Sequence, residues 1–402
     1  MSYLKLDVTS IPVNTTNMSK KLFLPLWILG SLLLFLYSFT QVDLSLTLSK
    51  ASIFQTIEKG FQYVGWFNRP VSTYLYIAVF AFLFFLYLWT IKLISQKKLN
   101  RKTVWLGIFI VTGILTLSYN AFSYDLFNYV FDAKIVTFYH QNPYIHKALD
   151  FPNDPMLSFM RWTHRVYPYG PVWLGLTVPL SFIGGNIFIV TVYLFKIMIA
   201  SFFLLTVWSL ERIGKTLKFE NVLLPMVAFA FNPFVLSESL VSAHNDIVMM
   251  GLAIYATSLL MDKRTVKGSV IYLLSVGLKF ATAFSFAGYT LLLLLKKTKY
   301  VIEASMILSI VAVIVASMRT NFQPWYLLYV IPFAVLRLEK RYVRYPLYLF
   351  SVASVIYYVP FLYSGNWNDP IPMILNSIVI GVTVLSIVVA LVFFPHSKKE
   401  TN

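Results

Sequence analysis

Long apolar stretches separated by short polar clusters dominate the chain. A membrane-spanning helix needs about 20 mostly apolar residues, and runs near that length recur along the sequence. The pattern predicts an all-α polytopic membrane protein with about 10 full spans. We expect these spans at 22–39, 72–95, 103–119, 188–210, 221–240, 246–261, 299–318, 344–362 and 371–394, with 324–337 as a shorter candidate.

Two further apolar segments do not fit as full spans. Segment 268–295 has basic residues on both flanks, so the chain enters and leaves on one side, yet the segment is too short to cross twice at 1.5 Å per residue. It is predicted to be a broken hairpin of two half-helices with Gly277 to Lys279 near its apex. Segment 171–187 contains two prolines and a Gly-Gly pair, and we expect it to be re-entrant or to lie at the interface.

Charge supports the membrane reading. Hydrophobic residues make up 58% and charged residues 12%, against roughly 25% charged in a soluble domain. The formal charge of +17 would suggest nucleic acid in a soluble protein, but here the basic clusters flank the apolar runs. Placing these clusters inside puts the N-terminal segment 1–21 and the tail 395–402 in the cytoplasm, with the basic face against membrane lipids and no nucleic-acid partner.

The connecting segments are lopsided in length. The inner connections are short, whereas the predicted outer connections 40–71 and 120–170 are long. No internal repeat or linker divides the sequence, so we expect one membrane domain over 1–402, with an extracytoplasmic loop at 120–187 that carries the chemistry. There is no cysteine, which excludes disulfides and thiolate chemistry.

The first polar group follows the third predicted span. Asp125, Asn128, Tyr129 and Asp132 are spaced i, i+3, i+4 and i+7, which places them on one face of a helix. The intervening apolar residues would then lie on the bilayer. Two carboxylates on one face suit acid–base chemistry, and a solvated polar face on an interfacial helix is the competing interpretation.

Aromatic residues crowd the rest of this loop. Tyr144 follows Asn-Pro, and Tyr167 and Tyr169 lie in a Tyr-Pro-Tyr-Gly-Pro run. Such residues form a rigid platform that can stack on a sugar or cover a lipid headgroup, and an aromatic belt at the membrane interface is an equally good interpretation.

A second polar group lies between two predicted spans. Placing polar side chains near a bilayer costs free energy unless they are paired or solvated. This group contains four such residues: Glu238, His244, Asn245 and Asp246. A metal site is disfavoured because no second His stands at i+4 and the spacing fits no standard ligand set. The alternative is that Asn245 or Asp246 caps the following helix.

Two basic residues are candidates for binding phosphate. Lys279 lies at the apex of the predicted broken hairpin in a run with no other charge, where a cation is well placed for a phosphate; snorkelling to the interface is the alternative. Arg319 precedes a short span on the outer side and suits bidentate phosphate binding, with structural pairing to Asp246 or Glu238 as the competing use. The sequence has no Walker loop or glycine fingerprint, so an outward-facing enzyme must take its activated substrate from the lipid.

These motifs, in this order, resemble the GT-C superfamily of integral-membrane glycosyltransferases, and most closely the polyprenol-phosphate-mannose-dependent α-1,6-mannosyltransferases. The resemblance covers about half of the chain, roughly 120–330. It rests on Tyr124-Asp125, Asp132-Ala133-Lys134, Asn142-Pro143-Tyr144, Tyr167 to Pro171, His244 to Met249, Lys279 and Gln323 to Leu327.

The resemblance implies a GT-C fold, a sugar donor on polyprenyl phosphate and a glycan or lipid acceptor outside the cytoplasmic membrane of a bacterium. It implies an inverting hexosyl transfer, mannose favoured, with Asp125 as the base and Asp132 as the alternative base or an acceptor ligand. Lys279, Arg319 and His244 would neutralise the donor phosphate. We expect the sugar and acceptor to be bound by Asn128, Tyr129, Lys134, Tyr144, Tyr167, Tyr169, Asn245, Asp246, Gln323 and Trp325.

Some points stay open at the level of sequence. Ala133 and Lys134 replace the glycine and arginine common in the family, which puts the identity of the sugar in question. The resemblance implies no cofactor, while dependence on a divalent metal is left undecided. A transporter or flippase for a lipid-linked sugar is the rival class; it predicts an inverted repeat and balanced loops, and the sequence has neither.

Overall fold

The computed structural model describes residues 15–394, and all regular structure in that range is helical, which confirms the all-α class. Most of the expected N-terminal tail and the whole C-terminal tail lie outside the described residues. Six helical segments in the described range are long and apolar enough to cross a bilayer. They are α1 (Thr15–Ser38), α3 (Arg69–Ser95), α7 (Phe188–Thr216), α13 (Val301–Thr320), α15 (Arg341–Ile356) continued by α16 (Val359–Ser364), and α17 (Ile371–Phe393).

A seventh span results if α8 and the segment from Pro233 to Val241 count as one broken span, bent by 55°. The remaining apolar helices are shorter than a usual span, so the count of about ten full spans stays a prediction. The shorter α-helices are α4 (Arg101–Thr116), α6 (Pro171–Ile183), α8 (Leu223–Ala230), α9 (Pro233–Leu236), α10 (Asp246–Met261), α11 (Thr265–Leu278), α12 (Thr282–Leu294) and α14 (Ile331–Ala334).

The other elements lie in connections. They are η1 (Phe39–Gln41), α2 (Ser52–Gln62), η2 (Tyr63–Phe67), α5 (Asp125–Thr137), η3 (Ala148–Asp150), η4 (Pro155–Ser158), η5 (Ser237–Val241), η6 (Thr298–Tyr300), η7 (Pro324–Tyr329) and η8 (Val335–Arg337). Local sequence sets several helix starts. The Asn100 side chain accepts a hydrogen bond from the Thr103 N–H (2.8 Å) at the start of α4, and Pro171 opens α6, where its missing N–H costs nothing.

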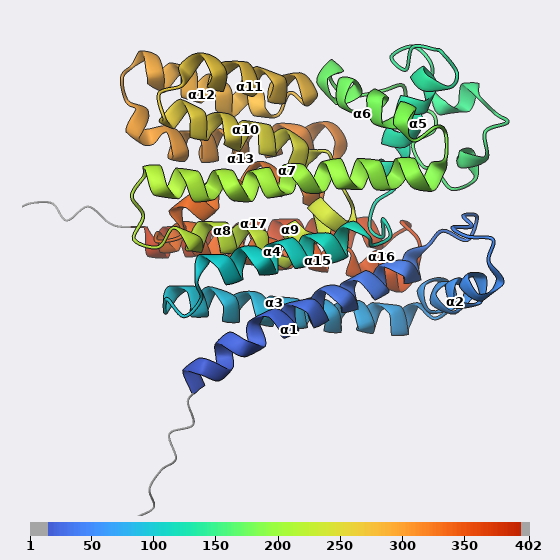
Figure 1. Cartoon of the computed structure of the whole chain (residues 1–402), viewed down its shortest axis with the longest axis horizontal. Helices are drawn as coiled ribbons and strands as arrows, with labels where there is room; N and C mark the ends of the chain where they lie inside the picture. The colour runs from blue at the N-terminus through green and yellow to red at the C-terminus, as the bar shows by residue number, and fades with distance from the viewer. Residues whose placement is uncertain (1–14, 395–402) are drawn as a thin grey trace, which may run out of the picture.

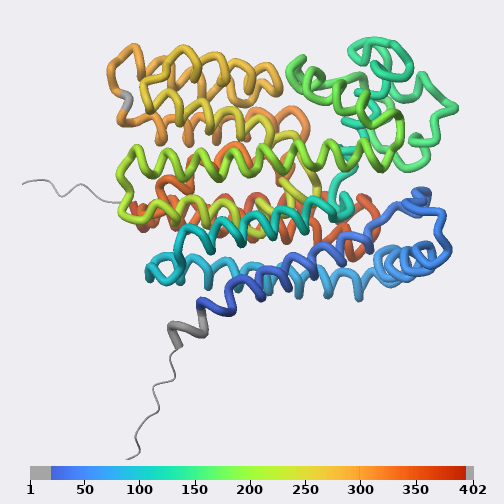
Figure 2. Tube along the Cα trace, in the orientation of Figure 1, coloured from blue at the N-terminus to red at the C-terminus, as the bar shows by residue number. Residues whose placement is uncertain are grey.

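The helices form an elongated bundle with its long connections gathered at one end. Figure 1 shows α3 and α7 running the length of the molecule, with α2, α5 and α6 at the right-hand end. The chain trace places the blue connection after α1 and the green connection around α5 at that same end (Figure 2). Helix α1 begins, and α17 ends, toward the opposite end. The two long connections predicted from sequence therefore share one side of the bundle.

The opposite end carries the basic clusters together with several acidic partners. Arg101 of α4 and Lys215 of α7 both pair with the buried Glu211 at 2.6 Å. Lys97 pairs with Glu220 at 3.0 Å. These contacts join the turns after α3 and α7, so some of the basic residues hold neighbouring helices together.

Helix α10 is one of the most deeply buried helices of the bundle. It packs against α7 on one side and α11 on the other, and most of its residues are buried. Helix α17 packs mainly against α15 and keeps most of its apolar surface exposed, as expected for a helix that faces lipid.

The broken hairpin predicted at 268–295 is present as α11 and α12, which meet at residues 279–281. The loop that precedes α6 docks on this break: the Gly170 N–H donates to the Leu278 carbonyl at 3.0 Å. A Cβ at Gly170 would lie 2.1 Å from the Gly277 carbonyl oxygen, a distance that no side chain tolerates. Glycine is therefore required where this loop meets the hairpin.

Gly170→Ala is expected to lower the free energy of unfolding by about 1–3 kcal/mol or more, because the new methyl group pushes the loop off the hairpin. Thermal unfolding in detergent measures this loss. The matched control is Gly175→Ala in α6, where nothing lies within 4 Å of a new Cβ and alanine favours the helix. Equal unfolding midpoints for the two variants would show that the loop is not docked as described.

Candidate functional site

Helix α5 brings the first candidate residues to the end of the bundle that carries the long connections. Asp125 is its first residue, which suits a carboxylate at a helix N-terminus, and its N–H donates to the Ser123 hydroxyl at 3.1 Å. The expectation that the apolar face of α5 lies on the bilayer is wrong. Leu126 and Phe131 are fully buried, because α5 packs against α6 and α7 rather than against lipid.

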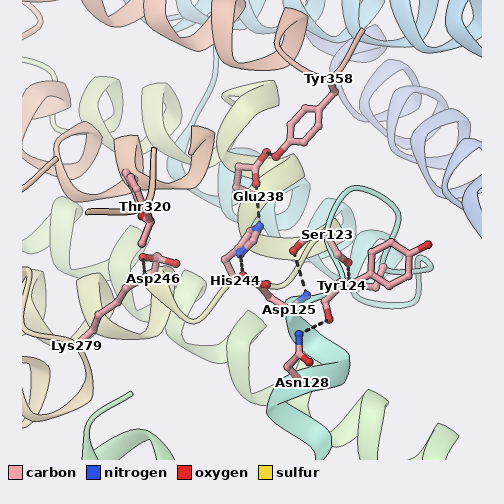
Figure 3. Close-up of polar contacts among 12 residues, drawn as sticks. Ser123, Tyr124, Asp125, Asn128, Glu238, His244, Asp246, Lys279, Thr320 and Tyr358 are labelled. Atoms are coloured by element: carbon pink, nitrogen blue, oxygen red, sulfur yellow. Dashed lines mark hydrogen bonds and ion pairs between the residues drawn. The ribbon is translucent and has the colours of Figure 1, made fainter. Parts of the chain in front are cut away.

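A chain of polar side chains runs inward from Asp125. Its carboxylate lies 3.4 Å from His244 Nδ1, and His244 Nε2 lies 3.2 Å from the Glu238 carboxylate. Glu238 also accepts a hydrogen bond from the Tyr358 hydroxyl at 3.0 Å. Figure 3 shows these four side chains in sequence, contributed by α5, the turn before α10, η5 and the segment before α16. His244 is stacked on Trp325 with ring centroids 4.2 Å apart.

The two carboxylates around His244 set its charge. The ring is completely buried, and burial alone would lower the pKa of His244, but Asp125 and Glu238 raise the pKa overall to about 9. His244 was expected to bind the donor phosphate. The structure instead places both ring nitrogens against carboxylates.

The second pair of charges lies on the other side of His244. The Lys279 ammonium contacts the Asp246 carboxylate at 2.6 Å, with Asp246 buried and Lys279 about one quarter exposed. Lys279 immediately follows α11, and Asp246 is the first residue of α10. The break in the hairpin therefore places the Lys279 side chain beside the start of α10 (Figure 3). The rings of Tyr169, Tyr326 and Tyr329 lie within about 6 Å of the ammonium, a cation–π arrangement.

The second carboxylate of α5, Asp132, has a shifted pKa. Burial and the nearby Asp125 raise the pKa of Asp132 to about 8, so Asp132 is mostly protonated at neutral pH. A protonated carboxyl cannot accept a proton from a substrate hydroxyl. Protonation therefore counts against Asp132 as a base at neutral pH.

The aromatic platform is assembled as expected. Tyr129 meets Tyr169 edge to face with centroids 5.3 Å apart, and Tyr169 meets Tyr167 in the same manner at 5.6 Å. The Tyr144 hydroxyl donates to the Tyr169 carbonyl at 3.2 Å. Because Tyr169 also contacts Lys279, the platform links the loop residues to the charged pair.

Other predicted residues lie apart or lack their expected contacts. Lys134 is ion-paired with the buried Asp154, which also accepts from the Tyr139 hydroxyl at 2.7 Å. Burial would raise the pKa of Asp154, but these hydrogen bonds lower it overall, so the pair has a structural role beside any other. Arg319 is exposed at the end of α13, and Asp246 and Glu238, its suggested partners, pair elsewhere.

The three amide candidates differ in burial. Asn245 is completely buried at the N-cap position of α10 without a side-chain cap, and neither of its amide atoms has a partner among residues 15–394. The Asn128 amide donates to the Tyr124 carbonyl at 3.4 Å, and Gln323 is half-buried directly before η7. In the part of the chain that the structure describes, no group of three or more His, Asp or Glu residues is arranged to hold a metal ion.

Sequence reasoning missed a third polar contact next to Asp125. Asp43, in the connection after α1, accepts a hydrogen bond from the Tyr124 hydroxyl at 2.9 Å and lies 3.7 Å from the Arg161 guanidinium. Asp43 is almost fully buried. An acidic residue directly after the first apolar run was the available signal, but its partners lie far along the chain.

Comparison with known proteins identifies the family of the chain. The model of a family described as "Alpha-(1->6)-mannopyranosyltransferase, N-terminal domain" matches residues 27–296, well over half of the chain. The chain belongs to this family. The match includes α5, the turn with His244 and the hairpin with Lys279, and it ends before Arg319 and Trp325.

Two curated relatives share parts of the sequence, and both are named Alpha-(1->6)-mannopyranosyltransferase A. The Corynebacterium glutamicum protein is 27% identical over 143 residues, covering 35% of this chain and 29% of that protein. The Mycobacterium tuberculosis protein is 25% identical over 170 residues, covering 42% and 32%. The chain thus spans about a third of the length of the curated relatives that it matches. No solved structure matches the chain.

Proposed function

We propose that this membrane protein transfers one mannosyl residue from a polyprenyl-phosphate donor to a hydroxyl group of a glycan or lipid acceptor outside the cytoplasm. The observation that carries the proposal is the placement of an acidic side chain and the cation of the broken hairpin in one site. Asp125 lies on one side of His244, and Lys279 lies on the other side beside Asp246 (Figure 3). Family membership and the names of the two relatives support mannose and an α-1,6 linkage.

The mechanism follows from these positions. Asp125 takes the proton of the acceptor hydroxyl while its oxygen attacks the anomeric carbon, and the bond from that carbon to the phosphate oxygen breaks. One displacement inverts the anomeric configuration. The Lys279 ammonium has three N–H donors, and one of them donates to Asp246. The other two have no hydrogen-bond acceptor among residues 15–394 and can bind the departing phosphate. Arg319, exposed at the end of α13, is a second cation for this phosphate.

The aromatic platform supplies the walls for the sugar. Tyr129, Tyr169 and Trp325 lie around the two charged groups and present ring faces or edges without adding charge. Such surfaces hold the apolar faces of a sugar ring and exclude water. This arrangement fits a donor that arrives through the membrane, with its prenyl chain in lipid and its phosphate beside Lys279.

A donor panel tests the proposed function. Purified protein in lipid vesicles is given an acceptor and, in separate reactions, polyprenyl-phosphate mannose, polyprenyl-phosphate glucose or a mannose nucleotide. We expect release of polyprenyl phosphate with the lipid-linked mannose and no turnover of the nucleotide. Turnover of the nucleotide, or movement of lipid-linked sugar across the vesicle without release of polyprenyl phosphate, would refute the proposal; the second result indicates a flippase.

A further inference from the structure

The turn between η5 and α10 is folded to place His244. η5 is a π-helical turn, and the Ser242 N–H donates to the Ser237 carbonyl at 2.8 Å. The His244 N–H then donates to the Glu238 carbonyl at 3.1 Å, which closes the backbone on itself. Ala243 adopts a left-handed φ of 53°, which is uncommon for a residue with a Cβ. Irregular, strained backbone of this kind is characteristic of functional sites.

Fixed contacts surround the imidazole. Asp125 and Glu238 face its two nitrogens, and Trp325 covers one face of the ring. Behind Glu238 stands Tyr358, whose hydroxyl reaches the other carboxylate oxygen. His244 and Glu238 are both completely buried, whereas the Asp125 side chain is 16% exposed. Of the three side chains Asp125, His244 and Glu238, only Asp125 is therefore partly exposed to solvent.

We propose that His244 is the positioning residue for Asp125 and that Glu238 and Tyr358 are the positioning residues for His244. The four side chains then act as one unit, from the buried end at Tyr358 to the carboxylate that meets the acceptor. This inference rests on the proposed function, since it gives Asp125 the part of the base. It assigns positioning roles to Glu238 and Tyr358. It also gives His244 a positioning role in place of the expected role in binding the donor phosphate.

The physical case is one of geometry and charge. A carboxylate at a helix start has several rotamers, and a fixed charged partner beside one oxygen restricts them. An imidazolium that lies within 3.4 Å of both carboxylates attracts them without adding a net positive charge at the base. Among residues 15–394, Glu238 is the acidic side chain that lies against Nε2, so it fixes the ring, and the Tyr358 hydroxyl fixes Glu238 in turn.

Glu238→Gln is expected to lower kcat about 10- to 100-fold, because a loosened His244 no longer fixes Asp125. The KM for the donor should change by less than about twofold, since Lys279 is untouched. Tyr358→Phe removes one hydrogen bond and should cost about fivefold in kcat. The matched controls are Glu220→Gln, an exposed residue at the other end, and Tyr363→Phe, an exposed residue of α16; both should keep wild-type kinetics.

The pH dependence of kcat distinguishes a positioning role of Glu238 from a purely structural role, because only the positioning role predicts a change in it. Asp125 from α5 and Glu238 from η5 are the carboxylates that face His244, and Lys279 and Asp246 neutralise each other on the α10 side. Loss of the Glu238 charge removes a group that favours the imidazolium, so the pKa of His244 falls. The alkaline limb of kcat should therefore move to lower pH in Glu238→Gln.

Histidine-selective ¹⁵N NMR tests the contacts without turnover. The signal that disappears in His244→Gln is expected to shift in both Asp125→Asn and Glu238→Gln. An inactive wild-type protein would refute the proposed function, and this spectrum would still decide the inference. The inference is overturned if Asp125→Asn leaves the signal unchanged, if Glu238→Gln raises the donor KM with kcat intact, or if Glu238→Gln lowers the unfolding temperature while kcat and its pH profile stay the same.

Discussion

Replacing Asp125 with Asn is expected to lower kcat by at least about 10³-fold at neutral pH, within the range that a lost general base costs. Asparagine keeps the shape of the side chain and its place at the start of α5, but it cannot accept the acceptor's proton. The KM for the donor should stay within about threefold, because the phosphate is bound by Lys279 rather than by α5. Steady-state release of polyprenyl phosphate gives both constants.

Asp132→Asn is the matched comparison for this prediction. Asp132 lies two turns further along the same helix, and its raised pKa of about 8 makes it largely neutral at pH 7. An amide imitates a neutral acid, so this variant should cost less than about tenfold in kcat. The reverse order of effects, with Asp132→Asn the more damaging, would transfer the part of the base to Asp132.

Lys279→Gln is expected to lower kcat/KM for the lipid-linked donor about 100-fold or more, since a cation that meets the departing phosphate is lost. The same change leaves the buried Asp246 without its ion-pair partner, which costs about 3–5 kcal/mol of stability. Donor titration and thermal unfolding of the same sample measure the two losses.

A double variant separates these two effects. Lys279→Gln combined with Asp246→Asn removes the uncompensated carboxylate, so the unfolding midpoint should recover while kcat/KM stays low. Lys267→Gln, an exposed lysine of α11, controls for loss of a positive charge on the same helix and should match the wild type. Recovery of activity together with stability in the double variant would mean that Lys279 serves folding alone.

The sequence could predict the features that depend on local pattern. Apolar runs located the long helices, and basic flanks with a short length located the hairpin whose break follows Leu278. Periodicity placed Asp125 and Asp132 on one helix, and the position of Lys279 at the hairpin break was also correct. These features need no knowledge of which helices are neighbours in space.

Features that depend on tertiary neighbours could not be predicted in this way. The sequence pattern of the apolar face of α5 is the same whether that face contacts lipid or protein. Only the packing of α5 against α6 and α7 shows that it contacts protein. Glu238 and Tyr358 are 120 positions apart, and Asp43 and Tyr124 are 81 apart, so no spacing rule connects them. The carboxylate neighbours of His244 come from different segments, so the sequence alone does not reveal these contacts.

The anomeric configuration of the product tests the central claim most directly. A single turnover of wild-type protein with polyprenyl-phosphate mannose of known configuration, followed by NMR of the isolated glycan, reports it without any variant. One displacement with Asp125 as the base predicts that the transferred mannose has the configuration opposite to that of the donor. A product with the donor's own configuration would require a covalent intermediate or a different active-site geometry, and it would contradict the account given for Asp125 and Lys279.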